Sequence, residues 1–417
     1  MTSSKRTTFS SPFGSKSPDT LLPALAAINS STNIALAAAN GITGSGVLIQ
    51  TEAGTTTLNA SDTAYGGLAA LTHGPKKISM KTSYLVAALF AAFTLNSDLR
   101  AALITMDWVT VGDPGNAADT DPAGYGAVAG SFRIMKFEFQ NSQYAAFLNA
   151  VAATDPYSLY NANMGSNPRG GITQSGSLGS YTYSVRTDMG DKPVNYVSWF
   201  DAARVSNWLQ NGQGSGDTET GAYTLSGATS GNAVAVNPGA TFYIPTEDQW
   251  YKAAYYKGGG TSAGYWDYAT QSDTAPTAVT AGTTGIGSAG NTGNFANFNR
   301  AASWNELNGN VTTVGSNGGP SDYGAFDMSG NVLEWNDLTG AADPSRGLRG
   351  GNYNDTIPSN LSSSSWSSYD PSFEIATLGF RLASPAATPI PEPGTWAAMA
   401  IFAGGAAYAG WRRRRRA

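Results

Sequence analysis

Apolar side chains recur with helical spacing at three places along the chain and predict its main helices. The first stripe consists of Tyr144, Phe147, Leu148 and Val151. These positions share one face, so we predict a helix here with Asn141 as its N-cap. A second helix is predicted over 198–209, capped by Ser198, and a third begins at Thr246 because Gln249 completes a capping box. All three helices are expected to be structural.

Short apolar runs broken by Gly, Asn, Ser and Asp predict strands between and after these helices. The strands are expected at 131–139, 181–186, 241–244 and 378–382. Long polar segments predict loops at 154–180, 211–240 and 257–296. No tandem repeat interrupts this pattern, so segment 103–385 is predicted to be one irregular, loop-rich α+β domain.

A second kind of apolar run begins close to Met80. Lysine follows Met80, an apolar stretch covers 84–95, and small residues stand at Ala101 and Ala102. This order is typical of a secretory signal peptide, which we predict over 80–102. Because export signals act at a true N-terminus, we interpret 1–79 as a mis-assigned or poorly ordered extension; the alternative is a soluble segment followed by an uncleaved apolar stretch.

The C-terminal end has three parts in a fixed order. A Pro-rich linker over 386–393 ends in Pro391, Glu392 and Pro393, and an apolar stretch follows it. Within 394–417 this stretch predicts one transmembrane helix, since about 17 helical residues span roughly 26 Å. The helix is closed by Arg412, Arg413, Arg414, Arg415 and Arg416, which are expected to remain in the cytoplasm.

This tripartite end resembles the PEP-CTERM sorting signal of Gram-negative bacteria. The resemblance implies export, recognition of the Pro-Glu-Pro motif by an exosortase, and an inner-membrane-anchored precursor. The mature protein is then expected at the cell surface or outside the cell. A plain C-terminal membrane anchor is the alternative, and it does not require the Pro-Glu-Pro motif.

Composition narrows the chemistry that the domain can perform. Of 417 residues, none is cysteine, and the one histidine is His73. These counts exclude a thiol nucleophile, disulfides, zinc fingers, iron–sulfur ligation and any site that needs two histidines. Segment 102–393 holds 12 basic and 25 acidic residues, which argues against a nucleic-acid partner.

Six motifs follow one another in the order known from one protein family. They are Phe137-Glu138 with Asn141-Ser142-Gln143-Tyr144; Lys192-Pro193-Val194-Asn195-Tyr196-Val197-Ser198-Trp199; Pro245-Thr246-Glu247-Asp248-Gln249-Trp250; Gly324-Ala325-Phe326-Asp327-Met328-Ser329-Gly330-Asn331-Val332-Leu333-Glu334-Trp335; Arg349-Gly350-Gly351-Asn352-Tyr353; and Leu378-Gly379-Phe380-Arg381. Together they resemble the sulfatase-modifying-factor domain, which includes formylglycine-generating enzymes and part of the ergothioneine-pathway sulfoxide synthases. The resemblance covers about 105–385 and implies an irregular α+β fold related to C-type lectins.

The family's oxidative chemistry does not carry over to this chain. The resemblance places the copper-binding cysteine pair of formylglycine-generating enzymes at Asp355 and Asn360, and a further common cysteine at Ser206. None of these side chains forms a thiolate that binds Cu(I). The histidines that hold iron in the sulfoxide synthases are also absent, so no copper or iron site is evident.

Calcium is the cofactor that the resemblance still allows. One site would use side-chain oxygens of Asn331 and Glu334 with the carbonyl of Val332, and a second would begin at Asn297 and Phe298. Hard oxygen ligands on a loop suit calcium. The alternative is that Asn331 caps a turn and that Trp335 fills the core.

Other side chains suggest weaker possibilities. Asp355, Asp370 and Glu374 are candidates for a carboxylate cluster in the cleft, although scattered surface charges explain them as well. Arg349 and Arg381 are expected to brace the Gly350-Gly351 loop through charge-assisted bonds. Trp304 and Trp366 lie in polar loops, where an exposed ring can stack on a sugar, although burial in the core is the default expectation for both.

These observations favour an exported, non-catalytic, calcium-braced surface or matrix binding protein. Its ligand is expected to be an exopolysaccharide or a cell-surface protein. The alternative is a metal-dependent enzyme of the same family with a rebuilt site, and a third possibility is a protein–protein adaptor.

Overall fold

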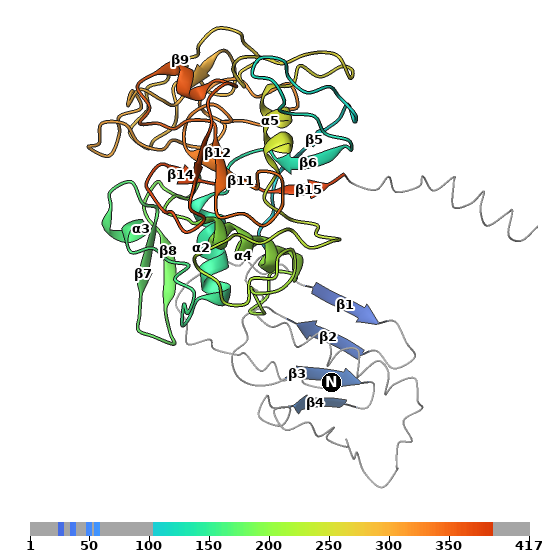
Figure 1. Ribbon diagram of the computed structural model, residues 1–417. Helices are drawn as coiled ribbons and strands as arrows, with labels where there is room; N and C mark the ends of the chain where they lie inside the picture. Colours follow the sequence, from blue (N-terminus) through green and yellow to red (C-terminus); the bar gives the residue numbers. More distant parts are fainter. Residues whose placement is uncertain (1–23, 29–33, 39–46, 52–53, 59–102, 387–417) are drawn as a thin grey trace, which may run out of the picture. The chain divides into compact units, whose positions relative to one another are not determined.

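The computed structural model describes residues 24–28, 34–38, 47–51, 54–58 and 103–386, and the chain divides into units 1–97 and 98–417 (Figure 1). In the first unit, β1 (Ala24–Ile28) pairs antiparallel with β2 (Ile34–Ala38). Strand β3 (Val47–Thr51) pairs in the same way with β4 (Gly54–Leu58). The interpretation of 1–79 as a mis-assigned or poorly ordered extension stays a prediction. A start of translation at Met80 stays a prediction.

The predicted targeting segments fall outside the part of the chain that the structure describes. This applies to the signal peptide at 80–102, to the Pro-Glu-Pro motif and to the apolar helix with its arginines. Among the described residues, no helix combines the length and the apolar character that crossing a membrane requires. The transmembrane helix therefore stays a prediction.

Three helices of the second unit agree closely with the sequence pattern. They are α2 (Asn141–Val151), α4 (Trp199–Gln210) and α5 (Glu247–Tyr255), and a single turn, α3 (Asn163–Ser166), follows α2. Capping boxes at Ser198 and Thr246 begin α4 and α5, as predicted. For α2 the predicted cap is wrong, because Gln140 takes that position. Asn141 is buried instead, and its amide donates to carbonyls of Met189, Lys192 and Pro193.

The two largest sheets of the domain have four and three strands (Figure 1). One has the order β13-β12-β11-β14, formed by Ser367–Tyr369, Arg346–Arg349, Leu333–Asn336 and Leu378–Gly379. Only the β11–β14 pair in it is parallel. The other is antiparallel with the order β15-β6-β5, formed by Ala383–Pro385, Phe132–Met135 and Trp108–Val111.

Short elements outside these sheets complete the domain. Strands β7 (Ile172–Ser175) and β8 (Thr182–Val185) form a hairpin, β9 (Thr277–Ala278) lies parallel to β10 (Phe295–Ala296), and η3 (Pro358–Leu361) is a 3₁₀ turn. The strand predicted at 241–244 is reduced to one bridge between Tyr243 and Ala383. Three of the four predicted strands are present in shortened form, so the fold is α+β and rich in loops, as expected.

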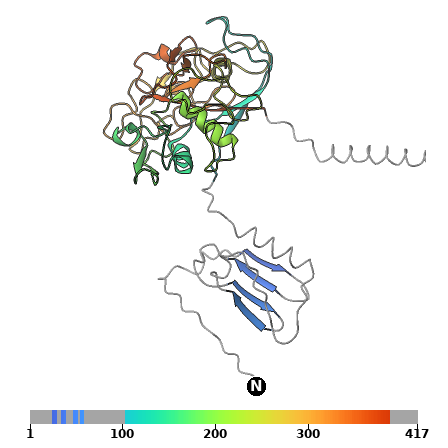
Figure 2. The ribbon, with the colours of Figure 1, turned by 60° about the horizontal axis from the view of Figure 1, so that its bottom comes forward.

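The packing of α4 explains why this loop-rich chain still has a large core. Every residue of α4 except Gln210 is buried, so the surrounding segments cover the helix, which is drawn in green in Figure 2. Trp199 packs edge-on against Phe200 and Tyr223 with ring centroids 5.2 and 5.3 Å apart. Trp335 of β11 reaches the same region and donates its indole N–H to the carbonyl of Val197. Aromatic burial of this kind contributes several kcal/mol, about 1.5–3 for each fully buried large side chain.

Candidate functional site

The loop after β12 turns sharply at two glycines. Gly350 and Gly351 have φ angles of +97° and +71°, a region that side-chain-bearing residues rarely adopt. A Cβ atom on Gly351 would lie 2.9 Å from the carbonyl oxygen of Asn360. Glycine at this position therefore lets the start of the loop pass close to η3.

This close approach brings the two predicted family-cysteine positions together. The Asn360 amide donates to Asp355 Oδ1 at 3.1 Å, and both residues are half-buried. Asp355 Oδ2 accepts from the backbone N–H and the side-chain amide of Asn352, each at 2.8 Å. Both carboxylate oxygens are thus occupied by neutral donors from the same loop. The arrangement holds no soft metal ligand and no activated nucleophile.

The carboxylate cluster proposed from the sequence does not form. Asp370 is exposed and accepts from Ser372, so it lies apart from the Asp355–Asn360 contact. Glu374 accepts from the Asn161 amide and lies near enough to the Asp201 carboxyl for its charge to act on that group. Scattered carboxylates, the alternative reading, describe these residues better.

Asp201 lies near Glu374, and the sequence did not predict that these two carboxyl groups are neighbours. Its Oδ2 atom accepts from the Ser198 N–H at 2.8 Å and from the Ser198 hydroxyl at 2.7 Å, which closes the capping box of α4. Burial, with the Glu374 charge as a second cause, raises the pKa of Asp201 well above its ordinary value. A neighbouring carboxylate disfavours the charged form of a buried carboxyl group, which adds to the effect of burial. The only sequence signal was the position of Asp201 in the first turn.

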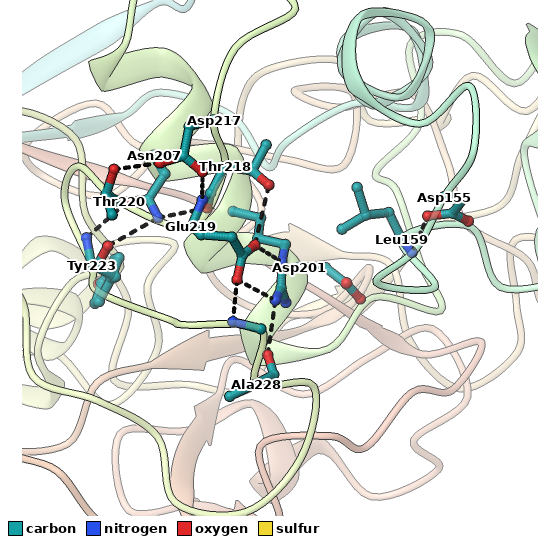
Figure 3. A network of polar contacts seen from close by, with 12 residues as sticks. Asp155, Leu159, Asp201, Asn207, Asp217, Thr218, Glu219, Thr220, Tyr223 and Ala228 are labelled. Atoms are coloured by element: carbon teal, nitrogen blue, oxygen red, sulfur yellow. Dashed lines mark hydrogen bonds and ion pairs between the residues drawn. The ribbon is translucent and has the colours of Figure 1, made fainter. Parts of the chain in front are cut away.

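The polar side chains of α4 otherwise hold the loop over 217–228. The Asn207 amide donates to the carbonyls of Thr218 and Tyr223 (Figure 3). Glu219 is bound by Arg204 at 2.7 Å and by the backbone N–H of Gly227. The Asn207 and Arg204 bonds join the helix to the loop, and the Gly227 bond closes the loop on itself, so the network has a structural role.

Glu334, one predicted calcium ligand, is the centre of a buried ion pair. Arg381 donates to both of its oxygens at 2.6 Å, and the Trp250 indole N–H donates to Oε2 at 2.8 Å. Glu334 and Arg381 are fully buried. This pair joins β11, α5 and the segment after β14, and it leaves the Glu334 oxygens engaged by protein donors.

Asn331, a second predicted ligand, is likewise engaged. Its Oδ1 atom accepts from the Thr312 N–H at 3.0 Å and the Asn297 amide at 3.1 Å. Its own amide donates to Glu138 at 2.7 Å, and the Val332 N–H donates to the same carboxylate at 3.2 Å. Glu138 belongs to the first family motif, but the sequence did not indicate a role for its carboxylate. Burial and the nearby Asp327 and Glu334 charges raise its pKa well above the usual range.

The predicted second calcium site begins at a side chain with a free oxygen. Asn297 is fully buried, and its Oδ1 atom has no hydrogen-bond partner in the described part of the chain. Phe298 follows it with a buried ring. An orphaned buried oxygen is compatible with a cation ligand, whereas the oxygens of Asn331 and Glu334 are not free. Within 103–386 and the four described strands before it, no three Asp, Glu or His side chains converge as a metal site.

The two arginines predicted to brace the glycine loop are buried, but their acceptors differ from the expected ones. Arg381 binds Glu334 and the carbonyls of Met135 and Phe326. Arg349 pairs with Glu247 and donates to the carbonyls of Ser363 and Ser365 at 2.5 and 2.8 Å. Arg349 therefore fixes the backbone immediately before Trp366.

The two tryptophans proposed for sugar stacking have different environments. Trp304 is 6% exposed, with Lys192 over its ring at 5.2 Å and its indole N–H bound to the carbonyl of Val311. Trp304 follows the default expectation of core burial and is not available for sugar stacking, because Lys192 and the segment near Val311 cover its ring. Trp366 is 57% exposed, and Ile357 and Tyr369 of the same segment are 58% and 43% exposed.

The surface of the domain is strongly acidic. Of the basic residues in 103–386, only Arg300 is exposed, and the others are buried or half-buried. Ten acidic residues are exposed there: Asp107, Asp121, Asp188, Asp191, Asp217, Asp267, Asp273, Glu306, Asp322 and Asp370. Polyanionic ligands are disfavoured by this distribution.

Comparison with protein families gives two matches. A family model described as the sulfatase-modifying factor enzyme 1-like domain matches 105–386, and one described as the PEP-CTERM protein-sorting motif matches 389–415. A search of curated proteins gives no match.

Solved structures similar to the chain include three with low identity. CarF is 22% identical over 67% of this chain and 98% of its own, with a TM-score of 0.40. Treponema denticola variable protein 1 is 19% identical over 67% and 94%, with a TM-score of 0.40. PvdO from Pseudomonas aeruginosa is 17% identical over 68% and 92%, with a TM-score of 0.33.

Proposed function

Because the chain belongs to the sulfatase-modifying factor enzyme 1-like family and ends in a PEP-CTERM sorting motif, we propose that it is an exported, non-catalytic binding protein. The observation that carries this proposal is the contact between Asp355 and Asn360. These residues stand where the resemblance places a thiol pair, and they satisfy each other by a hydrogen bond. The sorting motif makes an exosortase the expected processing partner, and the proposed destination is the cell surface or the medium.

The test of the non-catalytic role is an oxidation assay on the full chain. Purified protein is incubated with copper or iron, dioxygen and a cysteine-containing peptide, and the peptide mass and the bound metal are measured. We expect no oxidation beyond that of metal and peptide alone, and no stoichiometric copper or iron. Protein-dependent oxidation together with one metal per chain would instead favour the alternative, an enzyme with a rebuilt site.

A neutral polysaccharide is the ligand that we propose. The segment over 354–370 exposes Trp366, Ile357 and Tyr369, while Arg349 holds the carbonyls of Ser363 and Ser365. A ring that is exposed and fixed in place stacks on a sugar with little loss of conformational entropy. The excess of exposed carboxylates favours neutral over acidic polymers.

The ligand proposal is tested by binding of the full chain to immobilised neutral and acidic polysaccharides. Trp366→Ala is compared with Leu178→Ala, which removes an apolar side chain elsewhere that is 74% exposed, more than the 57% of Trp366. We expect Trp366→Ala to weaken binding about fivefold or more, equivalent to roughly 1 kcal/mol of stacking, and Leu178→Ala to have no effect. Equal affinities of both variants and the wild type would remove Trp366 from the binding surface. If the chain binds a cell-surface protein and no polysaccharide, the proposed ligand is a protein and not a polysaccharide.

We keep calcium as a proposed structural ligand, supported at Asn297 by its orphaned Oδ1 atom. Bound metal stabilises only the folded state, so a chelator should lower the melting temperature and added calcium should restore it. Magnesium serves as the control, because it needs a smaller octahedral site. A melting temperature that is the same with and without chelator would remove calcium from the proposal.

A further inference from the structure

A cavity of about 380 Å³ lies between the segment that leads into β5 and the start of α2. The segment over 103–107 forms one wall. The Ile104 N–H donates to Gln213 Oε1 at 2.8 Å, and the Gln213 amide donates back to the Ile104 carbonyl at 3.0 Å. On the helix side, the Gln143 amide donates to the carbonyl of Thr105 at 3.0 Å. Three side-chain bonds therefore hold this wall in place, which makes the cavity a built feature.

The cavity presents polar groups that have no role in the fold. The Thr105 and Ser142 hydroxyls and the Asp107 carboxylate line it, and none of them takes part in a hydrogen bond among 103–386. Met135, only 2% exposed, and Phe137 provide an apolar part of the lining. Hydroxyl donors and a charged acceptor thus stand beside apolar side chains.

The charge of the lining limits the class of ligand. No Lys or Arg lines the cavity, and Asp107 is its one charged residue. A phosphate, sulfate or uronic acid group would meet an unpaired carboxylate and no cation. A sugar matches the lining, because its hydroxyls donate to a carboxylate while its C–H face packs on apolar side chains. The volume is at the lower end of that of small-molecule sites, which is enough for a single ring and little more.

We propose that this cavity binds one neutral sugar residue, with Asp107 accepting from the sugar hydroxyls and Thr105 and Ser142 completing the polar contacts. The proposal rests on the polysaccharide-binding function above and adds a contact away from Trp366. Exposed aromatic residues bind sugars by stacking alone, whereas a cavity that adds hydrogen-bonding groups distinguishes one sugar from another.

The test is the affinity of the full chain for neutral oligosaccharides, measured by titration calorimetry and ligand-observed NMR. Asp107→Ala is compared with Glu306→Ala, which removes another exposed carboxylate that makes no hydrogen bond within the described domain. Since a hydrogen bond to a charged group contributes more than a neutral one, we expect Asp107→Ala to weaken binding about tenfold or more. Thr105→Val should weaken it less, and Glu306→Ala should leave it unchanged. Equal melting temperatures of the variants and the wild type exclude unfolding as the cause.

The outcomes separate this inference from the proposed function. Binding that falls in Trp366→Ala but not in Asp107→Ala or Thr105→Val overturns the cavity and leaves the polysaccharide function intact. Binding that falls in Asp107→Ala alone supports the cavity and removes Trp366. If no neutral saccharide binds the wild type, both the cavity and the polysaccharide ligand are refuted, while the non-catalytic role is still decided by the oxidation assay.

Discussion

Replacing Glu334 by glutamine tests whether this residue stabilises the domain as an ion-pair partner or as a calcium ligand. Glu334→Gln keeps the size of the side chain and removes its charge. Arg381 is fully buried and donates to both Glu334 oxygens, so the substitution leaves a buried guanidinium without its main partner. Breaking a buried pair from one side typically costs about 3–5 kcal/mol.

The surroundings of the pair place the expected cost near the lower limit. Glu138 and Asp327 also act on the Arg381 charge, and glutamine can still accept one bond from Arg381 or from the Trp250 indole. We therefore expect a loss of about 3 kcal/mol in the free energy of unfolding. At about 2–4 °C per kcal/mol for a domain of this size, the melting temperature should fall by roughly 6–12 °C.

The assay is urea unfolding followed by tryptophan fluorescence, together with thermal melts, each with and without a chelator. Glu306→Gln is the matched control, since the same change at an exposed position should stay within about 0.5 kcal/mol of the wild type. Arg381→Met and the double variant Glu334→Gln/Arg381→Met complete a double-mutant cycle. The double variant should lose less unfolding free energy than the two single variants lose in sum.

Two results would refute the reasoning about Glu334. A loss below about 1 kcal/mol would mean that the buried pair is not required for stability. A large loss that disappears in chelator would mean that Glu334 acts through a bound cation, as expected of a calcium ligand. The ion-pair interpretation requires the full loss in both conditions.

Three further predictions concern pH, backbone geometry and helix capping. Burial raises the pKa of Asp337 from 3.8 to about 6, so its contribution to stability is complete below pH about 4 and is lost as the pH rises through 6. The shift corresponds to about 3 kcal/mol. Asp337→Asn should therefore make the free energy of unfolding, measured by urea titration, depend less on pH between pH 4 and 7; the same pH dependence as in the wild type would contradict this. Gly330→Ala should cost more than about 2 kcal/mol, because φ is +93° and the new Cβ would lie 2.5 Å from the Asn297 carbonyl; Gly239→Ala, at φ +82° with open space, should lower thermal stability by only about 1 kcal/mol. Ser198→Ala should cost about 1 kcal/mol, because both the cap of α4 and a donor to Asp201 are lost, and a melting temperature equal to that of the wild type would show that the cap is dispensable.

The elements that the sequence predicts correctly are those that local contacts determine. Ser198 and Thr246 cap their helices through residues three positions away, so a short window contains all the information needed. Asn141 fails as a cap because its amide binds carbonyls near Met189 and Pro193. Long-range contacts of this kind have no local signal.

In the candidate site, too, the sequence predicts the local features and not the long-range contacts. The adjacency of Asp355 and Asn360 follows from the family resemblance, because the motifs fix the positions along the loop. The proximity of Glu374 to Asp201 and the burial of Trp304 depend on segments far apart in the chain. The cavity beside Asp107 also depends on a distant side chain, Gln213, that holds its wall. Sequence alone gives the residue types in these places but not their neighbours.

The distribution of charge bears on how copies of the protein pack in a crowded layer. With ten exposed carboxylates and Arg300 as the one fully exposed cation of 103–386, neighbouring domains repel one another over about a Debye length, roughly 10 Å at 0.1 M salt. At low ionic strength this repulsion keeps neighbouring domains apart, and added salt screens it and lets them approach. Spacing between molecules in such a layer would then depend on the surrounding salt more than on any contact between the proteins.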